Sequence, residues 1–482
     1  MTRQADIDRL PWRTPAPSLA ARTNRSEERK RDLRRHLGAR PQFAGTGDRT
    51  YSDVLDAYHG ETGLPLAENA VAALDLAWHE LMHTQPPDEY GDGTLYHKRQ
   101  PLVLRELAAH KLFGRLAVPV DSLPGVRVSP EEVIVCPYSS TMLLEEAVAT
   151  LARPGGVIVY PEGLYKSSGI HVEKYGLRMQ ACPVAPDDSF KIDPVLLASC
   201  LDYFAERDEL CGVLLTLPGN PVFTDYSAEE LLAIGRVLVA SGVPVICDMA
   251  FDCMVEQHIP IAAVQIATDD GVRRLYDQVL TITGNSKGYN AFGPCKLGAA
   301  CSGDTEWLAR IRERLTISFQ RESTHLARAI VEHTPESYFA QNRVRMLDQL
   351  DRAHGHIDAI NARFGAKVIR PLGSRQGMFL TVVFDDAVLD RAGVETSAEI
   401  ADLLLAGAGI DTVALDRTGS ERLGVRFNVL APRKAPGQES ADLVDELFDR
   451  LEQLLHAIRN GLTYPKVLAE RGLPVIEPAA AQ

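Results

Sequence analysis

The sequence predicts an α/β protein with a large domain, built on a mostly parallel sheet, and a smaller α+β domain. Between about residues 131 and 300, short apolar runs alternate with amphipathic helical segments. The runs are apolar at nearly every position, which indicates strands covered on both faces, as in parallel sheets with crossover helices. After about residue 304 a long helical stretch leads into strands and helices in a different order. This change of pattern indicates the second domain.

Length and composition restrict the class of protein. A chain of 482 residues is long enough for two sizeable cores, and its hydrophobic fraction of 45% is typical of a globular protein. The net charge of -14 argues against nucleic acid or an anionic membrane as the main partner. The sequence has no bilayer-spanning run and no signal-peptide core, so we expect a cytoplasmic location. Its eight cysteines are scattered without a CxxC pair, so we expect reduced thiols and no metal site.

The N-terminal part differs from the rest of the chain. Residues 1–50 form a basic extension, although the whole chain is acidic. Two interpretations stay open, a disordered tail or an arm that lies across an acidic partner subunit. Residues 51–115 are expected to contribute the first segment of the small domain and an active-site loop. They contain an amphipathic helical pattern over about 66–84 and a turn-rich polar segment over 90–98.

The large domain is expected to cover residues 116–325 and the small domain residues 326–460, followed by a peripheral tail over 461–482 that is rich in proline and alanine. In the large domain we predict strands at 133–135, 157–160, 213–217, 243–247 and 279–283, with helices over 142–151 and 228–240. In the small domain we predict strands near 377–384, 411–416 and 423–430, with helices near 397–407 and 438–459. Ligands of such parallel sheets bind at the carboxyl ends of the strands.

Polar side chains follow the predicted strands at those ends. Lys287 comes directly after the apolar strand and Gly284-Asn285-Ser286. Burial lowers the pKa of an amine, which is the state that a Schiff-base nucleophile needs; the alternative is a lysine that begins a surface loop. Asp248 ends another apolar strand, where a buried carboxylate requires a cationic partner.

Other residues at these ends have an ordinary interpretation beside a functional one. Ser139, Ser140 and Thr141 open a predicted helix, where they form a phosphate site or act as N-caps. Tyr165 is either a core aromatic or a ring that stacks on a flat cofactor. Asn220 lies in a Pro-Gly-Asn-Pro turn, and Lys296 lies among small residues that allow an anion to approach closely.

In this order, these features resemble the class I/II aminotransferases, the fold type I enzymes that depend on pyridoxal 5'-phosphate (PLP). The resemblance covers roughly residues 60–455. It implies that Lys287 forms the Schiff base with the cofactor, that Asp248 binds the pyridinium nitrogen and that Asn220 binds the ring hydroxyl. It also implies a substrate contact, from Arg426 to the α-carboxylate of an amino acid. The remaining implied cofactor contacts are Tyr165 and Phe251 beside the ring, Ser139, Ser140, Thr141, Ser286 and Lys296 at the phosphate, and Tyr96 at the phosphate of the other subunit in a homodimer with shared active sites.

The chain also departs from the family pattern. Phe251 stands where the family usually has a tyrosine, Lys296 where it usually has an arginine, and Val222-Phe223 where Asn-Pro is usually followed by x-Gly. The resemblance implies amino transfer on an α-amino acid through a quinonoid intermediate. The departures favour an alternative, β- or γ-elimination and replacement or cyclisation, for example on S-adenosylmethionine. A non-catalytic regulator is disfavoured because the lysine, the aspartate and Arg426 are all present.

Overall fold

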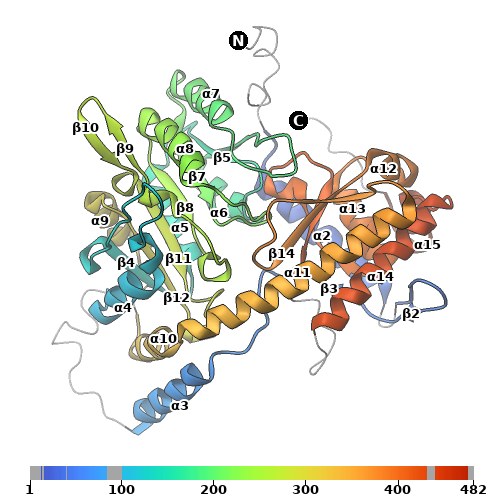
Figure 1. Ribbon diagram of the computed structural model, residues 1–482, viewed down its shortest axis with the longest axis horizontal. Coiled ribbons are helices and arrows are strands. Elements are labelled where there is room, and N and C mark those ends of the chain that lie inside the picture. Colours follow the sequence, from blue (N-terminus) through green and yellow to red (C-terminus); the bar gives the residue numbers. More distant parts are fainter. Residues whose placement is uncertain are drawn as a thin grey trace.

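The computed structural model describes residues 12, 16–38, 41–83, 100–317, 319–430 and 440–475. Tyr96 lies outside the described residues, so its proposed contact with a second subunit stays a prediction. The chain forms a larger part around one sheet and a smaller part around another (Figure 1). The long helix α11 (Glu336–Phe364) starts beside the larger part and continues along the smaller one (Figure 1).

A seven-stranded sheet organises the larger part. Its strands follow the order β4 (Val133–Pro137), β12 (Leu297–Cys301), β11 (Val279–Gly284), β8 (Val245–Asp248), β7 (Leu210–Thr216), β5 (Val157–Pro161) and β6 (Arg178–Cys182). β12 is antiparallel to both of its neighbours, β4 and β11, and the other neighbouring strands of this sheet pair in parallel. The mostly parallel sheet predicted from the apolar runs is therefore confirmed.

Helices cover both faces of this sheet, which explains why the strands are apolar throughout. Successive side chains of a strand point to opposite faces. Accordingly Val133 and Val135 belong to one buried core, and Ile134 and Cys136 to another. The flanking helices are α5 (Ser140–Leu151), α6 (Ser168–Glu173), α7 (Pro194–Ala205), α8 (Ala228–Ser241) and α9 (Thr305–Arg314).

The smaller part contains an antiparallel sheet in the order β13 (Ile369–Leu372), β14 (Phe379–Phe384), β17 (Gly424–Asn428) and β16 (Val413–Ala414). The predicted strand 411–416 is shorter than expected because a 3-10 turn begins at Leu415. Around the sheet lie α12 (Asp386–Ala392), α13 (Ser397–Leu403), α14 (Ser440–Arg459) and α15 (Tyr464–Glu470).

Segments from both ends of the chain complete the smaller part. Strand β3 (Leu55–Asp56) pairs in parallel with β15 (Ile410–Asp411). The prediction of a peripheral tail over 461–482 is wrong for α15. Its Tyr464, Val467 and Leu468 are buried, because the spacing of three and four residues places them on one helix face.

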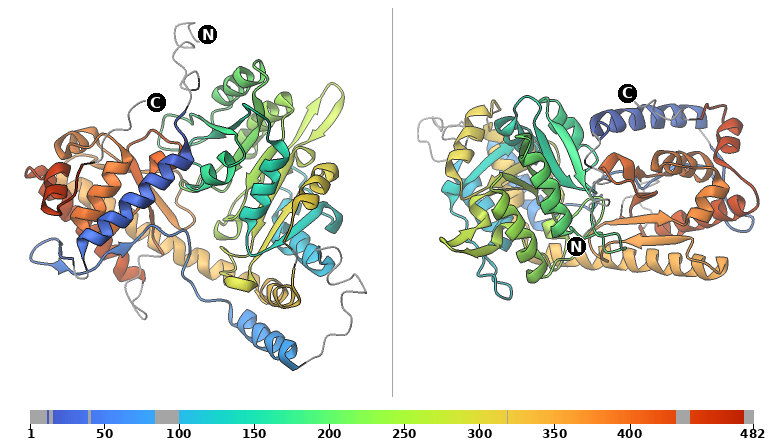
Figure 2. Two further views of the ribbon diagram at one scale, coloured as in Figure 1. Left: turned by 180° about the vertical axis from the view of Figure 1, so that it is seen from behind. Right: turned by 90° about the horizontal axis from the view of Figure 1, so that it is seen from above.

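The basic extension contains helix α2 (Leu19–Leu37). Its Leu33 and Leu37 are buried in the core of the smaller part. The left view of Figure 2 shows α2, in blue, lying across the orange and red elements of that part. The disordered-tail interpretation is therefore wrong for these residues, and the acidic groups that α2 meets belong to its own chain. They are Asp402, Asp411 and Glu421, paired with Arg29, Lys30, Arg34 and Arg22.

The remaining described elements lie at the periphery. The hairpins are β1 (Phe43–Ala44) with β2 (Thr50–Tyr51) and β9 (Gln265–Thr268) with β10 (Gly271–Arg274). Helix α3 (Glu68–His83) contacts α10 (Arg321–His333), and α4 (Leu102–Leu107) packs on the larger part. Within the described part of the chain, none of the helices has the length and apolar character needed to cross a membrane.

Candidate active site

A cavity of about 280 Å³ lies where the carboxyl ends of the parallel strands face the smaller part. All the predicted site residues that the structure describes line it. They are Ser139, Ser140, Thr141, Tyr165, Asn220, Asp248, Phe251, Ser286, Lys287, Lys296 and Arg426. These residues, which are far apart in the sequence, therefore lie together in one cavity, while the roles assigned to them stay predictions.

One corner of the cavity is suited to a phosphate. Ser139 is the N-cap of α5, and its Oγ accepts a hydrogen bond from the Thr141 backbone N–H at 3.0 Å. A helix N-terminus supplies free N–H groups and a partial positive charge, and Lys296 adds an ammonium to the same lining. Gly298 of β12 lies directly under this corner, since a Cβ there would be 2.7 Å from Ser139 C and Ser140 N.

Asp248 lies at the end of β8 and lines the cavity. Its carboxylate accepts a hydrogen bond from the Ala250 backbone N–H at 3.0 Å, and no described cation lies within ion-pair distance. Burial raises its pKa to about 6, with the Ala250 hydrogen bond and the Lys287 charge opposing this effect. A carboxylate in this position can accept a cationic N–H group from a ligand.

Lys287 follows β11 and lies in the cavity, so the interpretation as a lysine beginning a surface loop is wrong. Its Nζ donates a hydrogen bond to the Gly60 carbonyl oxygen at 2.7 Å. Burial lowers the pKa of this amine to about 8, and the charges of Lys296 and Arg426 act in the same direction. At pH 7 about a tenth of the amine is thus unprotonated and nucleophilic, far more than for an exposed lysine.

Arg426 is a buried cation without a described carboxylate partner. It lies on β17, and its side chain is 1% exposed. Its guanidinium donates to Asn220 Oδ1 at 2.7 Å and to the Tyr58 carbonyl oxygen at 2.5 Å, and it lies 3.9 Å from the centre of the Phe379 ring. Its Nε has no hydrogen-bond partner among the described atoms, and burial lowers its pKa to about 9.

The other almost fully buried arginines of the described chain are paired differently. Arg417 contacts Glu27 at 2.8 Å, and Arg450 contacts Asp53 at 2.8 Å and also Glu446. A buried charge normally requires such a partner. Arg426 is thus suited to bind an anion that enters the cavity.

Phe251 and Tyr165 supply aromatic surface to the cavity. Phe251 packs edge-on against Phe223 and Phe379, with ring centres 5.8 and 5.3 Å apart. The position that usually carries a hydroxyl in the family is therefore part of an apolar cluster here.

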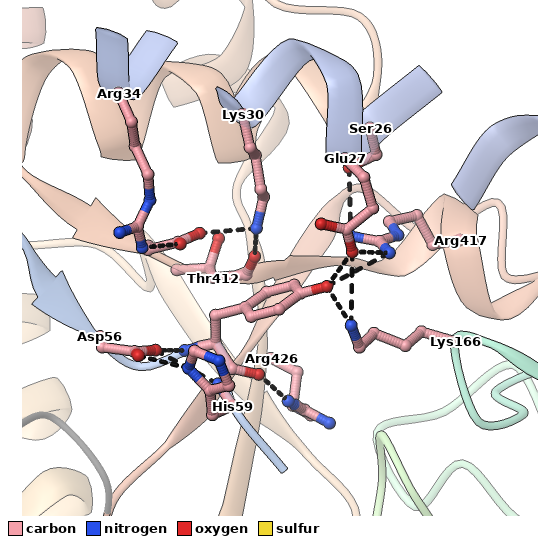
Figure 3. Close-up of polar contacts among 12 residues, drawn as sticks. Ser26, Glu27, Lys30, Arg34, Asp56, His59, Lys166, Thr412, Arg417 and Arg426 are labelled. Atoms are coloured by element: carbon pink, nitrogen blue, oxygen red, sulfur yellow. Dashed lines mark hydrogen bonds and ion pairs between the residues drawn. The ribbon is translucent and has the colours of Figure 1, made fainter. Parts of the chain in front are cut away.

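Sequence reasoning missed several lining residues. Tyr58 and Gly60 lie in an irregular segment between β3 and α3, which has no periodic signal. Lys166 follows Tyr165, but nothing in the sequence distinguishes it from an exposed lysine. Figure 3 shows Lys166 reaching toward Glu27 of α2 and Arg417, with Arg426 nearby.

Comparison with known proteins decides the family. The model of aminotransferase class I and II matches residues 64–428. The chain belongs to this family. Its members depend on PLP, and the aminotransferase resemblance found in the sequence is confirmed.

Two curated relatives match part of the chain. A probable N-succinyldiaminopimelate aminotransferase of Mycobacterium tuberculosis is 28% identical over 192 residues, which are 39% of this chain and 45% of that protein. An aspartate aminotransferase of Geobacillus stearothermophilus is 27% identical over 35% of this chain and 40% of that protein. The chain thus spans less than half the length of the curated relatives that it matches.

Solved structures match nearly the whole chain at lower identity. An aspartate aminotransferase from Rhizobium meliloti has a TM-score of 0.67 and 14% identity, and the match covers 95% of this chain and 99% of that one. The N-succinyldiaminopimelate aminotransferase from M. tuberculosis has a TM-score of 0.64 and 20% identity, over 92% and 98%. These similarities confirm the predicted fold type I architecture of the aminotransferase family.

Proposed function

We propose that the protein is a PLP-dependent aminotransferase that acts on an α-amino acid. The observation that supports this most is the pair of uncompensated charges in one cavity. Asp248 is a carboxylate without a described cation in ion-pair distance, and Arg426 is a guanidinium without a described carboxylate. The first is complementary to a protonated ring nitrogen and the second to an amino-acid carboxylate, while the corner at Ser139 is complementary to a phosphate.

PLP, when bound, would supply a conjugated ring that accepts the electron pair released at the substrate Cα. Lys287 would hold the cofactor covalently through Nζ and, once displaced by the substrate, take up the Cα proton and return it. Its lowered pKa suits this exchange near neutral pH. Asp248 would keep the ring nitrogen protonated, and Arg426 would fix the substrate carboxylate with its two terminal nitrogens.

Elimination, replacement or cyclisation is the second candidate, and Phe251 favours it. Without a hydroxyl at this position the cofactor oxygen has one donor fewer than in typical family members, which alters the electronic balance of the ring. The products separate the candidates. Amino transfer gives a keto acid without ammonia and needs an acceptor for turnover, whereas elimination releases a leaving group and ammonia.

Borohydride reduction of the purified holoprotein tests the cofactor assignment. We expect a yellow protein in which reduction attaches the cofactor to Lys287, as seen by peptide mapping. The substitution Lys287→Met should abolish the label, and the control Lys296→Met should keep it on Lys287. A label on Lys296 in the native protein would overturn the assignment of all the site residues.

We further propose a cytoplasmic homodimer in which Tyr96 contacts the partner subunit's cofactor phosphate, since the family resemblance places it there. The domain boundaries proposed are 51–115 and 326–460 for the small domain and 116–325 for the large one. Sedimentation of the active protein tests the assembly, and a fully active monomer would contradict it.

A further inference from the structure

A second cavity, of about 170 Å³, adjoins the first one at Lys287. The two cavities share the lining residues Glu61, Ser286, Lys287 and Lys296. Among the described residues that line the second cavity, the charged ones are Glu61, Lys287 and Lys296. A ligand that binds Arg426 in the first cavity and approaches Lys287 can therefore extend into the second cavity, where it meets the carboxylate of Glu61.

The Glu61 carboxylate forms neither a hydrogen bond nor an ion pair within the part of the chain that the structure describes. Its charge nevertheless acts on the site. Burial lowers the pKa of Lys287 to about 8, and among the neighbouring charges that of Glu61, which opposes burial, has the largest effect on this pKa. The carboxylate is therefore close enough to influence Lys287 without forming an ion pair with it.

The other charged side chains of the two cavities have either a partner or a role in the proposed function. Those with a proposed role are Asp248, Lys287, Lys296 and Arg426. Lys166, on the cavity wall beside α2, pairs with Glu27 at 3.5 Å, and His59 pairs with Asp56. Once the cofactor and the α-carboxylate of a substrate are bound, Glu61 is thus the charge that still lacks a partner.

Strand β17 fixes the position of Glu61 relative to Arg426. Asn428 is fully buried and lies two residues after Arg426, so both side chains point to the same face of the strand. Asn428 Nδ2 donates a hydrogen bond to the Glu61 carbonyl oxygen at 2.9 Å, and Arg426 donates one to the Tyr58 carbonyl oxygen. The chain from Tyr58 to Glu61 spans at most about 11 Å. One short molecule can therefore reach both Arg426 and Glu61.

We propose that Glu61 is a specificity-determining residue that binds a cationic group, an ammonium or a guanidinium, in the side chain of the substrate amino acid. The inference rests on the proposed function, in which Arg426 takes the α-carboxylate. A cation in the second cavity forms a charge-assisted hydrogen bond with the Glu61 carboxylate, whereas a neutral side chain there leaves this charge without a partner. A carboxylate in the same place would be repelled by the like charge of Glu61.

Calorimetric binding of unreactive acids to the holoprotein tests this role without turnover. The matched pairs are β-guanidinopropionate with β-ureidopropionate, γ-guanidinobutyrate with γ-ureidobutyrate, and δ-guanidinovalerate with δ-ureidovalerate. The two members of a pair have nearly the same shape and differ in one positive charge. We expect at least one guanidino acid to bind about fivefold or more tightly than its ureido counterpart, which corresponds to the upper range for an exposed charge pair.

Glu61→Gln, which keeps the size of the side chain, should remove this preference. Glu68→Gln, in the exposed first turn of α3, is the matched control and should leave both affinities unchanged. Equal affinities within every pair in the native protein would overturn the inference, as would a preference that persists in Glu61→Gln. If Glu61→Gln shifts only the pH titration of the visible cofactor band and leaves the preference intact, Glu61 acts on Lys287 alone and the inference is wrong.

The same measurements separate this inference from the proposed function. A preference that depends on Glu61, in a protein that forms no keto acid from any amino acid, would support the cation-binding role and refute the proposed function. Keto-acid formation without such a preference would support the proposed function and overturn the role of Glu61.

Discussion

The substitutions Arg426→Met and Arg450→Met distinguish a buried arginine that binds a ligand from a buried arginine that stabilises the fold. Both side chains are almost fully buried, but only Arg450 contacts described carboxylates, those of Asp53 and Glu446. We expect opposite results from the two variants. Arg450→Met should destabilise the protein and spare the site, whereas Arg426→Met should spare the fold and impair amino-acid binding.

The magnitudes follow from the contacts. Lowering the Arg426 pKa from 12.5 to about 9 corresponds to roughly 5 kcal/mol of cost for the buried charge. Methionine removes this cost, but it also removes two hydrogen bonds from the charged group, to Asn220 and Tyr58, worth roughly 3–6 kcal/mol together. The two effects nearly cancel. Arg450→Met instead breaks the ion pairs of a fully buried guanidinium with Asp53 and Glu446, which costs about 3–5 kcal/mol.

Thermal denaturation of the holoproteins measures the difference in stability between the two variants. These free-energy costs are divided by an unfolding entropy scaled to the chain length. The result is a fall in Tm of roughly 3–5 °C for Arg450→Met and a change within about 2 °C for Arg426→Met. Spectral titration with an amino acid measures the difference in amino-acid affinity. Losing a buried charged contact should weaken binding by about 100-fold or more in Arg426→Met, with cofactor affinity nearly intact. An Arg426 variant that is as unstable as the Arg450 variant and binds amino acids normally would refute this reasoning.

Three further predictions concern the cofactor. Asp248 has a folded-state pKa of about 6 against 3.8, so its contribution to apoprotein stability is favourable at low pH and is lost as pH rises from about 4 through 6. Asp248→Asn should therefore raise the apoprotein Tm at pH 7.5 and only slightly near pH 4, and weaken PLP binding; a lower apoprotein Tm at every pH would contradict this. Phe251→Tyr should lower the midpoint of the pH titration of the visible cofactor band by about one to two units, since a hydrogen bond to a charged acceptor contributes about 1.5–3 kcal/mol; superimposable titrations would show that the hydroxyl does not reach the cofactor. Gly298→Ala should reduce PLP affinity at least about tenfold, because its Cβ would displace the backbone at Ser139 and Ser140, whereas Gly355→Ala, with open space in the middle of α11, should only stabilise the helix slightly; equal PLP affinities in the two variants would contradict the packing argument.

Much of the site could be predicted because its residues directly follow strands. Asp248 is the last residue of β8, Lys287 is the first charged residue after β11, and the ends of neighbouring parallel strands meet at one edge. The apolar runs that identified those strands are buried on both faces, so their pattern is strong. Edge strand β6 was not predicted, because its sequence mixes exposed and buried positions.

The wall around Lys166 could not be predicted, because long-range packing creates it. Lys166, Glu27 and Arg417 are far apart in the sequence, and they meet only because α2 docks on both parts of the molecule. The N-terminal extension has few apolar residues besides Leu33 and Leu37, so the sequence left a disordered tail and a docked arm both open. Its stability comes from these two leucines in the core of the smaller part and from ion pairs with carboxylates that no local pattern reveals.

The position of α2 affects how the two parts of the molecule can move. Its first turn is attached to the larger part, where Glu173 of α6 accepts hydrogen bonds from Ser18 and from the backbone N–H groups of Leu19 and Ala20. Its later turns are attached to the smaller part through Arg29 and Lys30. The same end of α2 also contacts the larger part through the hydrogen bond from Thr23 to the Lys166 carbonyl oxygen and through Leu19, which is buried beside Gly169 of α6. A rotation of one part against the other must therefore either bend α2 or break this whole set of contacts, so the helix braces the two parts at both of its ends.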